Sequence, residues 1–362
     1  MKRIIILLLS VLPLVCSCEY DFEIRGNISE DKLNVICVIN EDGETYLNVE
    51  TAIPVNKYDK NAHIDTSLVK LEMLVNGEVC DIYRKDPPVT ITSWGDTLSM
   101  NDFKFWGTDR KMNPGDVVEV KAKGMNTPEV YTTTLVPSKL KLKGLKSDVV
   151  TLKNELRDYE MVRYQVSVDE VDENSYYGIL ITSQTHMTYY RQDGSTHEEE
   201  NLETFYIQSE AEASESFFEY GGAPVFIPAR YNGYYISKNA YDTKQLQLFS
   251  GKEFKDGVMN VYTSYFPSGD SIWYEEETVF EDGRWQENWI ESKVNIQRKY
   301  QVQVYKVTDD IYYYCRALYM ASENILANFG LAPSNFSFSN VKNGFGVCGA
   351  ISRTDSDWFL VD

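Results

Sequence analysis

Short alternating segments separated by turn residues constrain this chain more than any other feature. In residues 69–75 apolar side chains alternate with other side chains, Asn76-Gly77 follows, and a second β-prone segment spans 78–83. Alternation with a period of two is typical of a half-buried β-strand, and Asn-Gly is the strongest short signal for a hairpin turn. Comparable segments recur along most of the chain. The pattern therefore predicts a mainly β protein.

The spacing of these segments divides the chain into two folding units. Residues 33–137 hold about seven short strands, which suits the size and strand number of an immunoglobulin-like β-sandwich. Residues 138–362 are expected to form a larger antiparallel β domain that carries one C-terminal helix. The strands expected in it include a hairpin around Asp193-Gly194 and the segments 258–266, 283–290 and 296–307.

The helix is expected near residues 309–328. Ile311, Cys315 and Leu318 follow helical spacing, and acidic residues in the first turn complement the helix dipole. We expect this helix to pack against the sheet as a plug. Because tyrosines surround it, docking of the helix on a partner is the alternative.

The first residues predict export and a lipid anchor. Residues 4–15 form an apolar run behind Lys2-Arg3. The run is shorter than the roughly 20 residues that a membrane-spanning helix needs, but it has the length of a signal-peptide core. It ends in Val15-Cys16-Ser17-Cys18, which resembles the lipobox of bacterial lipoproteins, with an aliphatic residue three before the modified cysteine and a small residue directly before it. Ordinary secretion and a buried segment of the fold are the alternatives.

We therefore expect residues 1–17 to be a lipoprotein signal peptide and residues 18–32 to be a lipidated linker. Cys18 would attach the chain to outer-membrane lipid. The acidic residues directly after it loosely resemble a surface-export signal of Bacteroidota lipoproteins, so we expect the chain to face the cell exterior, with the periplasmic leaflet as the alternative. The formal net charge of −20 argues against a nucleic-acid partner, because phosphate binding needs a basic surface.

Metal and cofactor signatures are absent from the sequence. His63, His186 and His197 are the only histidines, and no pair of them has metal-ligand spacing. The acidic run 169–173 has a composition that could hold calcium, but a solvated turn between strands is the favoured interpretation. We expect no metal and no cofactor.

Four cysteines follow the lipobox: Cys37, Cys80, Cys315 and Cys348. In an exported chain they could form two disulfide bridges, with three possible connectivities. We favour buried thiols for most of them, because Cys37 and Cys315 lie in apolar surroundings, where cysteine behaves as a small hydrophobic residue.

Four sequence phrases together resemble one family. They are residues 113–120 with 134–137, residues 247–257, residues 304–314 and residues 333–350. In this order, behind a lipobox, they resemble the domain-of-unknown-function 4249 family of Bacteroidota lipoproteins. The chain departs from the usual closing phrase at Phe345 and Cys348. The resemblance implies a surface lipoprotein that is accessory to nutrient import beside outer-membrane TonB-dependent receptors, and it supplies no catalytic residues.

Glycines in the closing phrase have a physical meaning of their own. Asn343-Gly344 and Gly346 permit a positive φ or a close approach of the backbone beside a strand. We expect them to shape a bulge and a turn rather than to contact a ligand.

An aromatic-rich, loop-like stretch is the candidate contact surface. It contains Phe217, Phe218, Tyr220, Tyr231, Tyr234 and Tyr235. Exposed aromatic rings stack on sugars or peptides and anchor protein interfaces, although these rings could instead belong to the core of a sheet. We expect a non-catalytic lipoprotein that binds a solute or docks on a TonB-dependent receptor.

Two other functions stay open. The first is an exported hydrolase acting on glycan or peptide, since a glycosidase needs only two suitably spaced carboxylates. No serine-nucleophile signature is evident, however, and we expect no enzyme. The second is a structural or adhesion module of the cell surface.

The lipid anchor can be tested directly. Changing Cys18 to Ala should abolish incorporation of labelled palmitate and release the chain from the membrane fraction, because acyl chains contribute about 0.8 kcal/mol per buried CH₂ group. Both quantities are measured by fractionation of labelled cells. Equal labelling and equal membrane association of the unaltered and altered chains would contradict the anchor.

Overall fold

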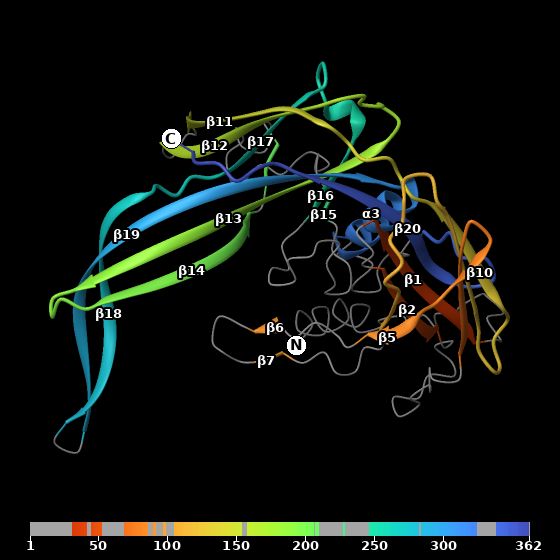
Figure 1. The fold of residues 1–362 in the computed structure, drawn as a ribbon, viewed down its shortest axis with the longest axis horizontal. Helices are drawn as coiled ribbons and strands as arrows, with labels where there is room; N and C mark the ends of the chain where they lie inside the picture. The colour runs from red at the N-terminus through yellow and green to blue at the C-terminus, as the bar shows by residue number, and fades with distance from the viewer. Residues whose placement is uncertain are drawn as a thin grey trace, which may run out of the picture.

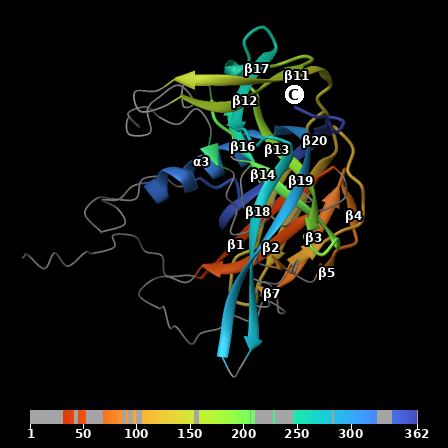
Figure 2. The same cartoon turned by 90° about the vertical axis from the view of Figure 1, so that its left-hand side faces the viewer.

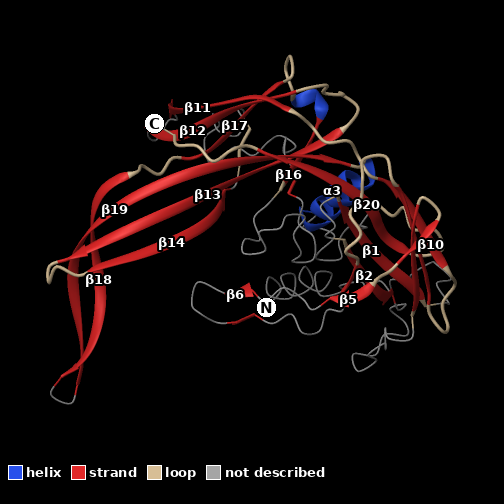
Figure 3. Cartoon of the chain, in the orientation of Figure 1, coloured by secondary structure: helices blue, strands red, loops and turns tan. Residues whose placement is uncertain are grey.

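The computed structural model describes residues 31–41, 45–52, 69–85, 90–91, 97–98, 105–153, 158–205, 207–209, 227–228, 246–281, 284–323 and 338–361. These residues are mainly β-strands, as Figure 3 shows, and the predicted fold class is confirmed. They form one α-helix and four sheets, the largest of which has eleven strands.

The eleven-stranded sheet contains strands from both the N-terminal and the C-terminal parts of the chain. Its path is β15 (Ile227–Pro228), β16 (Gln247–Ser250), β13 (Tyr176–Arg191), β19 (Arg284–Val307), β20 (Phe345–Asp355), β1 (Lys32–Asn40), β2 (Tyr46–Ala52), β8 (Phe105–Gly107) and β5 (Tyr83–Lys85). Two further strands lie off this path: β14 (Thr196–Phe205) pairs with β13, and β18 (Gly269–Glu281) pairs with β19.

Three smaller sheets complete the β structure. A four-stranded sheet has the order β10 (Val130–Leu135), β9 (Val117–Lys123), β3 (Lys70–Val75) and β4 (Glu78–Cys80). A three-stranded sheet has the order β11 (Leu142–Lys153), β12 (Asp158–Val168) and β17 (Val258–Ser264), and β6 (Thr90–Ile91) pairs with β7 (Thr97–Leu98). The predicted Asn76-Gly77 turn joins β3 to β4, and both residues have a positive φ, as a two-residue hairpin turn requires.

The N-terminal strands form the predicted sandwich. Leu33, Cys37 and Leu47 on β1 and β2 share one buried apolar cluster with Met73 and Val120 on the four-stranded sheet. Two sheets that bury their facing side chains against each other are the definition of a β-sandwich.

The last strand joins the two predicted units. β20 pairs in parallel with β1, from Asn34 opposite Phe345 to Asn40 opposite Ile351, and antiparallel with β19. One sheet therefore continues from the sandwich into the C-terminal half of the chain. The division after residue 137 stays a prediction, but the pairing shows that the two segments share this sheet.

Two layers cover the C-terminal half of the large sheet, one on each face (Figure 1). On one face Tyr164 and Val166 of β12 pack with Tyr177 and Ile179 of β13 and with Val304 of β19 in a single cluster. The opposite face is covered by the helix α3 (Asp309–Glu323). Alternate residues of β13 therefore serve two different cores.

The helix begins where the spacing predicted, at Asp309, and its described part ends at Glu323. Ile311 and Cys315 are buried against Leu180 and Tyr305 of the sheet. The ring of Tyr312 stacks on Tyr176, with centroids 3.8 Å apart. The helix is thus a plug on the sheet, with Ile311 and Cys315 in the packed face, whereas Leu318 is exposed.

A close approach of β20 to β1 explains the glycine at position 346. Gly346 has a φ of +107°, and a Cβ atom there would overlap the carbonyl oxygen of Val35. The expected role of this glycine in the backbone is confirmed.

We predict that Gly346→Ala lowers the free energy of unfolding by about 3 kcal/mol or more, because the strained φ and the overlap with β1 act together. Gly77→Ala is the matched control: Gly77 has a φ of +82° but no heavy atom within 4 Å of a Cβ there, so only the conformational cost of roughly 1–2 kcal/mol remains. Urea unfolding measures both. Equal losses in the two variants would contradict the close approach.

Candidate functional site

Four strands extend beyond both covering layers as an arm, which we define as β14, β13, β19 and β18 in that order across the sheet. β13 and β19 pair without interruption from Tyr176 opposite Val307 to Arg191 opposite Ser292. Figure 1 shows the arm curving away from the sandwich, and Figure 2 shows β18 and β19 reaching past the other strands. The continuous pairing explains how a projection of this length holds its shape.

The outer face of the arm, which continues the face covered by β12, has a small core of its own. Met187, Tyr189 and Val294 are buried there together. Trp273 packs edge-on against Tyr189, with ring centroids 6.0 Å apart, and the Tyr189 hydroxyl donates to Glu199 Oε2 at 3.2 Å. These contacts tie β13, β14, β18 and β19 to one another.

The root of the arm is fixed by Arg298 of β19. Its Nε donates to Thr185 Oγ1 at 2.9 Å, and its Nη1 donates to the backbone carbonyl of Phe266 at 3.0 Å. The guanidinium also lies 5.1 Å from the centre of the Phe266 ring, which is the arrangement of a cation–π contact. Arg298 therefore links β13 and β19 to the segment that leads into β18.

The inner face of the arm, which continues the face covered by α3, exposes large apolar side chains. Tyr190, Lys293 and Ile272 are neighbours across three strands by register, and Tyr274 follows two residues after Ile272. Tyr190, Ile272 and Tyr274 are all exposed, as is Leu202 on β14. Aromatic and aliphatic side chains grouped in this way are typical of contact surfaces for proteins or sugar rings.

The edge of the arm at β14 has a different character. Glu198, Glu199 and Glu200 are exposed there, and among the described residues β14 pairs only with β13. His197 Nε2 lies 3.2 Å from Glu199 Oε1. A charged edge strand resists pairing with a second copy of the same edge. The arm thus has an acidic edge on β14 and exposed apolar side chains on β18.

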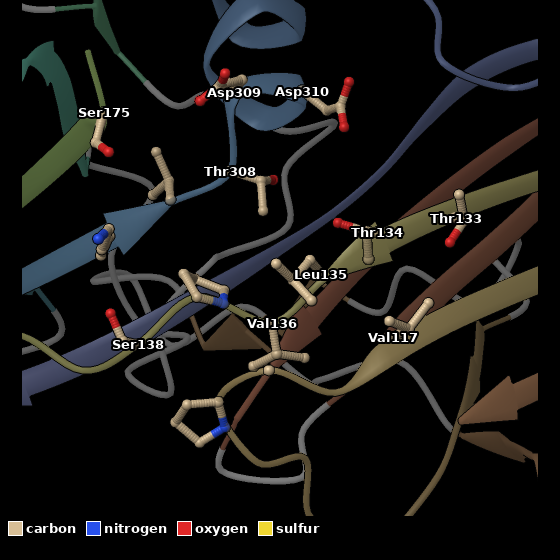
Figure 4. Close-up of a pocket in the computed structure, with 15 residues that line it drawn as sticks. Val117, Thr133, Thr134, Leu135, Val136, Ser138, Ser175, Thr308, Asp309 and Asp310 are labelled. Carbon is tan, nitrogen blue, oxygen red and sulfur yellow. The ribbon is translucent and has the colours of Figure 1, made fainter. Parts of the chain in front are cut away.

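A cleft of about 830 Å³ lies between the sandwich and the start of α3. Val117, Leu135 and Val136 form its apolar wall, and Thr308 and Asp309 stand opposite them (Figure 4). Its polar lining also includes Ser138, Ser175, Lys306 and Asp310. A concave, largely apolar surface with a few polar groups is typical of small-molecule sites.

The charged side chains that line the cleft are Lys306, Asp309 and Asp310. Burial raises the pKa of the Asp310 carboxyl, a hydrogen bond with Asn340 opposes the shift, and the neighbouring Asp309 adds to it. An apolar group could contact Leu135 while an amine or hydroxyl group approached Asp309. The cleft thus offers an apolar contact at Leu135 and a polar contact at Asp309 to one small molecule.

The residues that the sequence analysis singled out lie mostly elsewhere. Cys18 and the aromatic set, Phe217, Phe218, Tyr220, Tyr231, Tyr234 and Tyr235, fall outside the described residues. The acidic run 169–173 forms part of the turn between β12 and β13, where the backbone N–H of Asn174 and then the hydroxyl of Ser175 lower the pKa of Asp172. Within the part of the chain that the structure describes, no three His, Cys, Asp or Glu side chains group as a metal site would need.

The sequence analysis did not identify the residues of the arm or those of the cleft. Ile272, Trp273 and Tyr274 form a short β-prone run, which was the available signal for β18. The cleft gave no such signal, because Leu135 and Asp309 are distant in sequence and meet only through the fold.

One family model, described as a domain of unknown function (DUF4249), matches residues 18–357. No curated protein and no solved structure matches the chain. Among the described helical residues, none forms a helix long and apolar enough to cross a membrane.

Thr308 positions the wall of the cleft and can be tested. Its Oγ1 accepts a hydrogen bond from the buried N–H of Ala350 at 3.2 Å, and its own N–H donates to the Ala350 carbonyl. We predict that Thr308→Val, which keeps the shape but removes the oxygen, lowers the free energy of unfolding by about 1–2 kcal/mol. Thr308→Ser should stay within about 0.5 kcal/mol of the unaltered chain in the same urea titration. A Ser variant as unstable as the Val variant would contradict this role of the hydroxyl.

Proposed function

The chain belongs to the DUF4249 family, and from this premise we propose that it is a non-catalytic lipoprotein of the outer membrane that faces the cell exterior and docks on a TonB-dependent receptor as an accessory of nutrient import. The observation that carries the proposal is the arm, with its exposed apolar side chains on β18 and its charged edge on β14. The proposed attachment to lipid is through Cys18.

The shape and chemistry of the arm support docking on a protein. Interfaces are enriched in aromatic side chains at their centres, and Tyr190 and Tyr274 are both exposed on the inner face of the arm. The contacts of Tyr189, Glu199 and Arg298 hold these strands in place before any partner binds. A preorganised surface loses little conformational entropy on binding.

Binding of a solute is the second candidate function, and the cleft favours it. Its volume of about 830 Å³ lies within the range of small-molecule sites. Leu135 on one wall and Asp309 on the other offer apolar and acidic contacts to the same molecule.

The docking proposal predicts a defined loss of binding. The double variant Ile272→Ser/Tyr274→Ser removes two side chains that are 55% and 63% exposed, so the fold should remain intact. Capture of the receptor from detergent-solubilised outer membranes should fall at least tenfold, since loss of about 1.4 kcal/mol of binding energy weakens affinity by that factor. Quantitative mass spectrometry of the captured proteins measures the loss.

The matched control is Trp358→Ser/Leu360→Ser, which removes two side chains that are 39% and 59% exposed and also stand two residues apart, but outside the arm. It should capture as much receptor as the unaltered chain. Equal capture by both double variants would show that the arm is not the docking surface, and the absence of any outer-membrane receptor from the unaltered sample would overturn the docking function.

A further inference from the structure

Two of the four described cysteines are direct neighbours. Cys37 of β1 and Cys348 of β20 are register partners in the parallel pairing of these strands. Both are fully buried, and both belong to the apolar cluster of the sandwich, so their side chains leave the sheet on the same face. The remaining cysteines are separate: Cys80 contacts Thr108, and Cys315 of α3 packs against the sheet. All four are buried free thiols in the structure.

The spacing of the two strands suits a covalent bond between these thiols. Neighbouring strands lie about 4.8 Å apart. A disulfide requires a Cα–Cα separation of roughly 4.4–6.8 Å and Cβ atoms on the same side. Register partners whose side chains enter one core meet both requirements.

We propose that Cys37 and Cys348 form a disulfide bond in the exported protein, while Cys80 and Cys315 remain buried thiols. This inference does not depend on the docking role of the arm. The bond links the first described strand to the last, and it is a single bridge rather than one of the two-bridge connectivities that four cysteines allow.

The reaction needs a disulfide donor as oxidant, either a thiol-oxidising protein of the envelope or oxidised glutathione. One thiolate attacks a sulfur of the donor disulfide, which releases one donor thiol and leaves a mixed disulfide. The second thiolate then attacks the protein sulfur and releases the second donor thiol. Two protein S–H bonds are lost, one S–S bond forms, and the donor takes up the two electrons and two protons.

Burial places this step during folding rather than after it. The hydrogen bond with Cys37, and then burial, raise the pKa of the Cys348 thiol well above its ordinary value. A buried thiol with a raised pKa reacts slowly, because the thiolate is the nucleophile. The pair must therefore meet its oxidant while β20 is still joining β1, and the folded bond is then protected from reductants.

The test is differential thiol labelling of the full chain. Cells that export it are quenched in acid, free thiols are blocked with one alkylating reagent under denaturing conditions, and a second, isotopically distinct reagent is added after reduction. Peptide mapping should find the second reagent on Cys37 and Cys348, and the first on Cys80 and Cys315. Without reduction, one cross-linked peptide pair should contain both Cys37 and Cys348.

Matched variants control for indirect effects. In the Cys37→Ser and Cys348→Ser variants, the cysteine that remains of the pair should be a free thiol and should therefore carry the first reagent. Each variant should also lose the faster migration of the unreduced chain on a denaturing gel. Cys80→Ser should change neither readout. The first reagent on all four cysteines of the unaltered exported chain, or a cross-link in another pairing, would overturn the proposal.

A second experiment tests the disulfide independently of the proposed localisation. The purified chain is unfolded, reduced and refolded with a mixture of reduced and oxidised glutathione, and it should form the same cross-link without any membrane. Failure of the cross-link in correctly refolded chain would overturn the geometry. If chain isolated from the exporting cells carries the cross-link but no acyl group on Cys18, the anchor is overturned and the disulfide stands.

Discussion

The pairing of β20 with β1 is the interaction on which the rest of the structure depends. β20 is held on both sides, by β1 in parallel and by β19 antiparallel. It is the only link in the described sheet between the sandwich strands and the strands that extend into the arm. Because β1 and β20 lie far apart in the sequence, the pairing that joins the two parts of the large sheet forms only when both segments are present. Gly346 allows the two backbones to approach that closely.

β19 shows how one strand can serve several environments. Near its end Val304 lies in the core under β12 and Tyr305 lies in the core under α3. Further out, Val294 belongs to the small core of the arm. Because successive side chains of a strand point to opposite faces, β19 supplies residues to the cores under β12 and under α3, and further along it supplies residues to both faces of the arm. The position of the arm is therefore coupled to the packing of the two cores under β12 and under α3, since β19 runs through all of them.

Local features of the fold were predictable, and long-range ones were not. Asn76-Gly77 predicted a hairpin because the turn needs a positive φ at both positions, and the spacing of Ile311 and Cys315 predicted the helix. By contrast, 283–290 and 296–307 were predicted as separate strands but form the single strand β19. Neighbours on both sides supply hydrogen bonds to the polar residues between them, and local propensity carries no information about such partners. The cleft depends on the same long-range pairing.

The charge distribution limits how the arm can meet a partner. The exposed glutamates of β14 repel a second copy of this acidic chain as well as an anionic membrane surface, so that edge is suited to face solvent. Ile272 and Tyr274 lie on the opposite edge, where their register partners on β19 are Lys293 and Glu291. An approach at Ile272 and Tyr274 removes apolar surface from water and leaves the glutamates of β14 solvated, whereas an approach along β14 would desolvate several carboxylates at once. The exposed apolar pair therefore favours the start of β18, before Glu275, as the side of contact.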